Sequence, residues 1–189
     1  MFNKDVSSRF TTLNLAIMGM LAAVSIILVL TVRIRLIPAA PFLTYDMADI
    51  PILLGAFTLG PLAGILVLLA SAVVHAFMLG GHDIIGLIMN TASSMTLLLV
   101  SSFIFRRLGD TNRSLAISLI IGGLVMTAVI IPLNLIFIPL YTGMPVQAVI
   151  DLIIPVLLPF NLLKAAANAT IFFLLYRALR VVLPQYLKR

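Results

Sequence analysis

Long apolar segments without charged residues are the feature that most limits how this chain can fold. From Leu13 to Val32 the sequence contains no Asp, Glu, Lys or Arg, and three further stretches are nearly as free of charge. A helix needs about 20 such residues to cross the hydrocarbon core of a bilayer. The whole chain is 62% hydrophobic and only 10% charged, whereas a soluble domain carries about a quarter charged residues. We therefore predict an all-α integral membrane protein whose surface faces membrane lipid.

We predict six transmembrane helices in a single membrane domain over residues 1–189. Four apolar stretches are long enough by themselves, at 13–32, 84–105, 115–140 and 152–175. The region between them is too long for one helix and too short for two full ones, and Gly60-Pro61 favours a turn within it. We divide it into a short span at 47–59 and a further span at 62–79. A re-entrant segment would give the same pattern at 47–59.

The distribution of charge predicts the orientation. Six spans place both termini on one side of the membrane, and nine basic residues lie there: Lys4, Arg9, Arg106, Arg107, Arg113, Arg177, Arg180, Lys188 and Arg189. The opposite loops carry only Arg33 and Arg35, and four of the six Asp residues lie at those ends, Asp46, Asp49, Asp83 and Asp151. The positive-inside rule makes both termini cytoplasmic. No basic face with interleaved aromatic residues exists outside the spans, which argues against a nucleic-acid partner. The first run lacks a small-residue cleavage site, so we expect a retained helix.

Lys164 is the only full charge well inside a predicted span. It lies roughly 20 Å of helix beyond Asp151 at 1.5 Å per residue, and a charge at that depth costs about 2.5–3.5 kcal/mol on insertion scales. Asn161 and Asn168 stand at i−3 and i+4, so the three residues share one helix face. Either this stripe is the polar wall of a ligand site, or Lys164 is a packing residue satisfied by backbone carbonyls.

Two prolines, Pro155 and Pro159, precede this stripe. Each removes a backbone donor and frees a carbonyl one turn earlier. They either mark the start of the last helix or kink it beside the stripe.

Further polar residues lie in the outer halves of other spans, namely His75, Asn90 and Asn134. Taken singly, each is typical of a hydrogen bond between helices. Their shared bias toward the outside, together with Asn161, predicts a polar pocket open to the exterior. The loop from Arg33 to Tyr45 is either a connector or a lid over that pocket.

The first span carries small residues at Ala16, Gly19, Ala22 and Ala23. Small residues let another helix approach closely. They serve either packing within this chain or docking to another membrane subunit.

Catalytic patterns are absent from the sequence. It contains no cysteine, no H-E-x-x-H, no G-x-S-x-G and no P-loop. Ser71 and His75 are one turn apart, but their span has no acid to orient the histidine. We therefore expect no catalytic residues, no metal and no cofactor. An intramembrane enzyme using Ser71 and His75, or a membrane scaffold using the small-residue face, are the alternatives.

Two adjoining segments carry a family resemblance, PFLTYDMADIP at 41–51 and GAFTLGPLAG at 55–64. Further matches are LPFNLLK at 158–164 and PLN at 132–134 with IPLY at 138–141. Together they resemble the riboflavin-specific S components of energy-coupling factor (ECF) vitamin transporters. The resemblance implies a six-helix bundle that captures the vitamin from outside. It also implies a transmembrane coupling subunit and two ATPase subunits as partners.

The same resemblance implies which residues bind the ligand. Asn134, Asn161 and Lys164 would bind the flavin, the loop from Leu43 to Asp46 would cap it, and the surface around Gly19 and Ala23 would meet the coupling subunit. An isoalloxazine ring needs a flat apolar slot and polar partners for its pyrimidine edge. Phe42, Tyr45 and Phe160 would either line that slot or anchor the chain at the membrane interface. Asn90 or Asn134 would bind the ribityl hydroxyls.

The third span departs from the family pattern. Many members carry a Lys-Asn pair where this chain has Ser71 and Ala72, and His75 stands where Asn is frequent. Another vitamin or a related heterocycle is therefore the alternative ligand.

Overall fold

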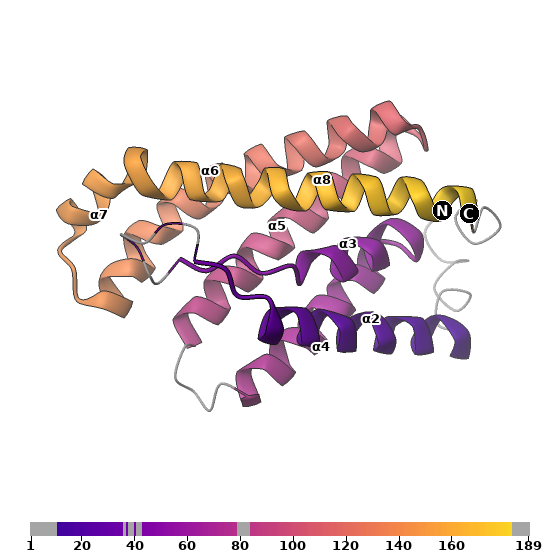
Figure 1. The fold of residues 1–189 in the computed structure, drawn as a ribbon, viewed down its shortest axis with the longest axis horizontal. Helices are drawn as coiled ribbons and strands as arrows, with labels where there is room; N and C mark the ends of the chain where they lie inside the picture. Colours follow the sequence, from indigo (N-terminus) through magenta and orange to yellow (C-terminus); the bar gives the residue numbers. More distant parts are fainter. Residues whose placement is uncertain (1–10, 36, 38–39, 41–42, 79–83, 183–189) are drawn as a thin grey trace, which may run out of the picture.

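The computed structural model describes residues 11–35, 37, 40, 43–78 and 84–182. These residues form an elongated helical bundle, and their only β-type pairing is one antiparallel bridge between Ile34 and Tyr45 (Figure 1). In chain order the elements are α2 (Thr12–Thr31), α3 (Asp49–Thr58), α4 (Pro61–Met78), α5 (Ile84–Leu108), α6 (Asn112–Thr142), α7 (Val146–Leu152), the π-helical segment η1 (Ile153–Leu157) and α8 (Leu158–Val182). The predicted all-α fold is confirmed.

Local sequence signals explain where several helices begin and end. The Thr11 side chain accepts a hydrogen bond from the Asn14 amide at 3.3 Å, and Thr111 caps α6 in the same way through Ser114 at 3.0 Å. Gly143 ends α6 with a left-handed backbone at φ 73°, which favours glycine. Gly60 turns the chain between α3 and α4 at φ 113°, as its position before Pro61 predicted.

Among the described residues, five helices are long and apolar enough to cross a membrane. The sixth predicted span, 47–59, corresponds to the ten-residue helix α3. At 1.5 Å per residue this helix is about 15 Å long, roughly half of the hydrocarbon core. In Figure 1, α3 starts near the middle of the bundle and runs to the end at which α2 begins and α8 ends. The described residues at 47–59 therefore form a half-length helix and not a full-length span.

The last helical stretch is longer than predicted. It starts at Val146 instead of Leu152. The additional residues form α7, which includes the polar residues Gln147 and Asp151. Pro155 lies within η1, where the Leu158 amide donates to the Ile153 carbonyl five residues earlier. Pro155 therefore lies in a π-helical turn directly before the Asn161–Lys164 stripe, a feature often found at functional sites. Pro159 lies in the first turn of α8.

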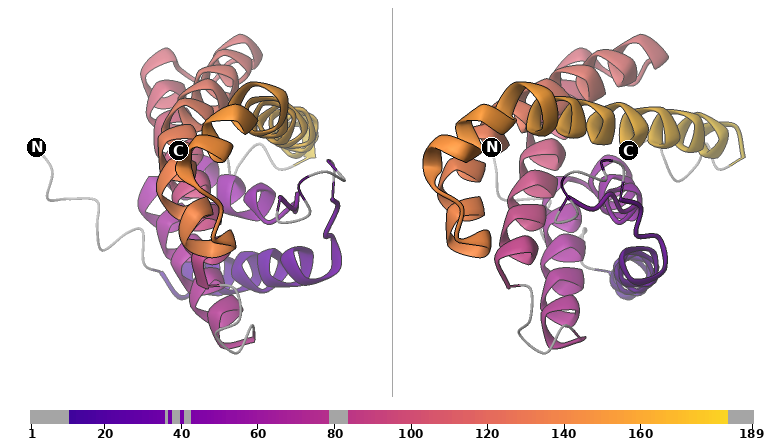
Figure 2. Two further views of the ribbon diagram at one scale, coloured as in Figure 1. Left: turned by 90° about the vertical axis from the view of Figure 1, so that its left-hand side faces the viewer. Right: turned by 60° about the vertical axis from the view of Figure 1, so that its left-hand side comes forward.

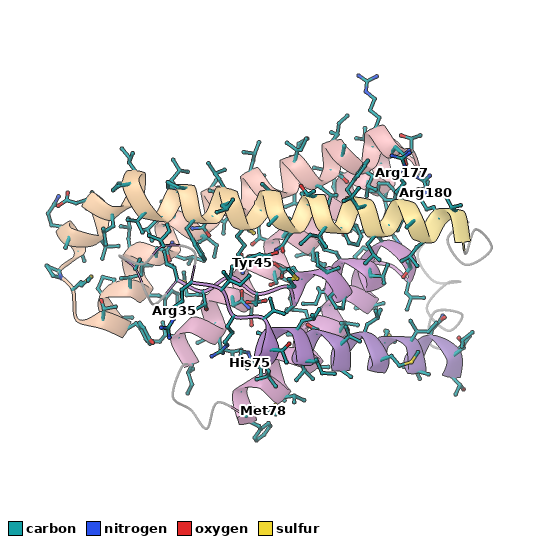
Figure 3. All side chains as sticks on the ribbon, in the orientation of Figure 1. Arg35, Tyr45, His75, Met78, Arg177 and Arg180 are labelled. Atoms are coloured by element: carbon teal, nitrogen blue, oxygen red, sulfur yellow. The ribbon has the colours of Figure 1, made fainter. Side chains whose placement is uncertain are left out.

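The end of the bundle nearest the start of α2 is closely packed. An aromatic cluster fills it, with ring centroids of Phe57 at 4.9 Å from both Phe105 and Phe172 and at 5.7 Å from Tyr176. Glycine permits close helix contacts as well, since a Cβ on Gly64 would lie 2.6 Å from the Ala56 Cβ. Figure 3 shows Arg177 and Arg180 at this end and Arg35 and His75 toward the other (Figure 3). The arginine-rich end is the predicted cytoplasmic end.

In Figure 2 the described part of the connection from α2 to α3 lies on the side of the bundle away from most of α5 and α6, and its end turns inward, where Asp46 accepts a hydrogen bond from Asn90 of α5. It leaves space between itself and those two helices in the outer half of the molecule, and side chains from both sides face that space.

Candidate functional site

A cavity of about 130 Å³ lies in the outer half of the bundle. It is bounded by α2, the connection, α4, α5, α6 and α8, so residues far apart in the chain meet there. Its polar lining consists of Arg33, Thr44, Asp46, His75, Asn90, Ser93, Asn134, Asn161 and Lys164. Its apolar lining includes Val29, Ile130, Phe137, Ile138 and Phe160. An apolar pocket with a few convergent polar groups is typical of a small-molecule site.

The structure brings together most of the residues that the sequence singled out. The predicted site residues that line the cavity are Leu43, Asp46, His75, Asn90, Asn134, Phe160, Asn161 and Lys164. Tyr45 does not line it, and Phe42 lies outside the described residues. Asn168 shares a helix face with Lys164 but lies beneath the cavity rather than in its wall.

A chain of hydrogen bonds holds the Lys164 head group. Its Nζ donates to the Asn90 Oδ1 at 2.5 Å, and the Asn90 Nδ2 donates to the Asp46 Oδ2 at 3.3 Å. Asp46 also accepts from the Ala48 amide at 3.0 Å. Lys164 is 4% exposed and Asp46 5% exposed. The ammonium group is therefore bound by a side chain from another helix and faces a cavity, which favours the polar-wall interpretation over a packing lysine.

A second network lies directly below. The Asn168 Nδ2 donates to the Asp49 Oδ2 at 2.5 Å, and the Ser94 hydroxyl donates to the other carboxylate oxygen. The Tyr45 hydroxyl donates to the Asn168 Oδ1 at 3.0 Å. Tyr45 lies in the connection and is buried, so this hydrogen bond anchors the connection to α8.

The placement of Asp46 and Asp49 corrects the sequence interpretation. We predicted both at the outer membrane surface, but they are buried at 5% and 1% exposure. The reason is that α3 begins halfway along the bundle, so both Asp46, near the end of the connection, and Asp49, the first residue of α3, lie inside it. The sequence signal for these two carboxylates was their D-x-x-D spacing within 41–51. That spacing does not show how deep in the bundle they lie.

Two residues at the mouth of the cavity pair with each other. The Arg33 Nη2 lies 3.3 Å from the His75 Nε2, and the Arg33 Nε donates to the Val29 carbonyl at 3.2 Å. Arg33 was predicted only as an outer-loop charge, and its place in the lining was missed. Ser93 was also missed, since it is one of four serines in the same helix and the sequence does not single it out.

Two amide groups in the cavity wall differ in their partners. The Asn161 Nδ2 donates to the Leu157 carbonyl at 2.8 Å, in the turn that follows Pro155. The Asn134 Nδ2 is buried and has no partner among the described residues. A buried donor without a partner is unfavourable and calls for a ligand or a water molecule.

The Ser71 hydroxyl donates to the Leu68 carbonyl at 2.9 Å. Its proton is therefore directed to the backbone of its own helix and not to His75. This geometry does not form a nucleophile and base pair.

The small residues of α2 divide between two faces. Ala16, Gly19 and Ala23 are exposed, whereas Ala22 is buried at 7% exposure. A Cβ on Gly19 would meet nothing within 4 Å. The exposed three residues thus do not serve packing within the described part of this chain.

The chain matches the family model described as "ECF transporter, substrate-specific component" over residues 13–176. It is 34% identical to the riboflavin transporter RibU of Staphylococcus aureus, covering 99% of this chain and 96% of the relative. It is 26% identical to the riboflavin transporter FmnP of Bacillus subtilis, covering 91% and 94%. A RibU of Streptococcus thermophilus is 28% identical over 91% and 85%.

A solved structure of the S component of a bacterial ECF transporter shares the fold. The TM-score is 0.75 at 33% identity, and the match covers 93% of this chain and 97% of the other. These findings confirm the predicted family and the multi-pass placement in the cell membrane. The chain therefore belongs to the substrate-specific components of ECF transporters, which makes it a membrane transport subunit and not an enzyme.

Proposed function

We propose that this chain captures riboflavin from the outer side of the membrane for an ECF importer. The observation that carries the proposal is the buried Lys164 head group at the wall of the outer cavity, next to the amides of Asn90, Asn134 and Asn161. The names of the three relatives support riboflavin as the transported ligand.

The chemistry of the cavity suits a flavin. The pyrimidine edge of the isoalloxazine ring carries one N–H group between two carbonyl acceptors. Lys164 offers N–H donors to a carbonyl, and the Asn161 amide offers an acceptor to an N–H group. Apolar residues such as Ile138 and Phe160 supply surface for the ring faces. The ribityl hydroxyls suit the polar mouth, where Arg33 and Thr44 lie.

The position of the cavity supports uptake from outside. It lies in the half of the bundle opposite the aromatic cluster and the arginine-rich end. Because that end is assigned to the cytoplasm, the cavity faces the exterior.

A direct binding measurement tests riboflavin capture. The purified protein, stripped of bound ligand, is expected to quench flavin fluorescence with one riboflavin per chain. A heterocyclic vitamin without an isoalloxazine ring, such as thiamine, serves as the competitor control and should displace nothing. A protein that binds no flavin at micromolar concentrations, or releases it to thiamine, contradicts the proposal.

Assembly with a membrane coupling subunit and two ATPase subunits is the second part of the proposal. The exposed Ala16, Gly19 and Ala23 of α2 form a flat surface on which a partner helix can approach closely.

Replacing Gly19 by leucine is expected to abolish riboflavin uptake by cells while leaving riboflavin binding by the purified subunit unchanged. The leucine side chain would hold a partner helix away, while a Cβ at this position meets no atom within 4 Å in the described part of this chain. Gly19→Ala is the matched control and should retain most uptake. Full uptake by Gly19→Leu would show that this face does not meet the partner.

A further inference from the structure

Ser93 on α5 is a buried hydroxyl without a hydrogen-bond partner. It is 4% exposed, and its Oγ has no partner among the described residues. The other buried serine and threonine hydroxyls in the described part of the chain all have one: Ser25, Ser71, Ser94, Ser101, Ser102, Ser114, Ser118 and Thr127. Ser93 is therefore the exception that needs an explanation.

Ser93 does not make the backbone hydrogen bond that such a hydroxyl usually makes. Serine and threonine in apolar helices commonly donate to a carbonyl about one turn earlier. On the same helix, Thr96 donates to the Ala92 carbonyl at 2.8 Å and Ser101 to the Leu97 carbonyl at 2.5 Å. The Ser93 hydroxyl makes no such bond, and Ser93 is one of the residues that line the cavity. Since a hydroxyl rotates to suit its partner, it is ready to donate to a ligand there.

The position of Ser93 is at the inner end of the cavity. It follows Asn90 by three residues, so the two share a face of α5, with Ser93 one turn deeper. The close contact between Ser101 and Gly122 fixes how α5 and α6 lie side by side. Because the two helices are antiparallel, counting eight residues from that contact toward the outer end leads to Ser93 on α5 and to Ile130 on α6. Both residues line the cavity. These two residues form its floor, beneath the Lys164–Asn90 hydrogen bond.

The polarity of the cavity indicates which end of a flavin reaches that floor. The mouth carries the charged side chain of Arg33, which pairs with His75. A hydroxylated chain keeps its hydrogen bonds near such groups, so its burial there costs little free energy. A flat aromatic ring gains the most free energy when it is removed from water. The ring system therefore enters first and approaches Ser93 and Ile130.

We propose that Ser93 is a ligand-binding residue that donates a hydrogen bond to a nitrogen or carbonyl acceptor of the flavin ring. This assignment rests on the proposed function and names a contact that the motifs at 41–51 and 158–164 do not contain.

The test compares riboflavin with lumiflavin, which has the same ring but a methyl group in place of the ribityl chain. Ser93→Ala is expected to weaken the binding of both ligands by the same factor, about threefold to tenfold, the worth of one neutral hydrogen bond. The ligand-free variant should melt at the same temperature as the unmodified protein or higher, because an unpartnered polar group has been removed.

Ser101→Ala is the matched control on the same helix. Its hydroxyl is satisfied by Leu97, so its loss should lower the melting temperature slightly and leave both affinities unchanged. Unchanged affinity in Ser93→Ala, or a loss confined to riboflavin, overturns the assignment. A lowered melting temperature with unchanged binding assigns Ser93 a structural role instead. Absence of flavin binding by the unmodified protein overturns the proposed function itself, and this assignment with it.

Discussion

Replacing Lys164 by methionine is expected to weaken riboflavin binding by about 10-fold to 150-fold, the worth of a hydrogen bond to a charged group. Methionine keeps the length and much of the apolar stem, so the variant removes mainly the ammonium group. That group lies at the cavity wall and donates to Asn90 at 2.5 Å. Its removal takes away the ammonium donor that we assign to a ring carbonyl. The measurement is a fluorescence-quenching titration of the purified variant.

The control for this variant is Leu163→Ala. Leu163 is the neighbouring residue but is 51% exposed and does not line the cavity. The riboflavin affinity of Leu163→Ala should equal that of the unmodified protein. The melting temperature of Lys164→Met is recorded alongside, to establish that the variant is folded. A folded Lys164→Met protein with unchanged affinity would show that the ammonium group does not touch the ligand.

Replacing Asp49 by alanine is expected to destabilise the protein by about 3 kcal/mol, because buried donors to a charged group lose their acceptor. The Asp49 carboxylate accepts from both Asn168 and Ser94, and Asn168 in turn accepts from Tyr45. Without the carboxylate, the amide and hydroxyl donors remain buried and unpaired. The link from α8 to α3 and to the connection is then lost. The measurement is the free energy of unfolding or the melting temperature in detergent.

Two further variants serve as comparisons for the stability of Asp49→Ala. Asp151→Ala removes the same side chain at an exposed position, where its bond to Gln147 at 3.3 Å is in solvent, so stability should change little. Tyr45→Phe removes one hydroxyl and should cost about 1 kcal/mol, the worth of one hydrogen bond. Equal stability of the Asp49 and Asp151 variants would rule out a structural role for the buried network.

Much of the fold could be predicted from the sequence because membrane insertion depends on local composition. Apolar runs such as 13–32 and 115–140 must be helical in lipid, since backbone groups there have no water to bind. The distribution of Lys and Arg predicts the orientation in the same local way. The outer-half positions of Asn90, Asn134 and Asn161 pointed to a pocket, because each depth follows from counting residues along one helix.

The contacts within the candidate site were decided by the tertiary structure alone. Lys164 meets Asn90 across 74 residues of sequence, and Asn90 meets Asp46 across 44. Such pairs depend on how the helices cross and on how far the connection folds inward. A local sequence pattern predicts neither of these. For the same reason the depth of Asp49 and the unpartnered hydroxyl of Ser93 could not be foreseen. A polar residue in an apolar helix shows that a partner is needed, but only the packing of the other helices determines which partner it finds.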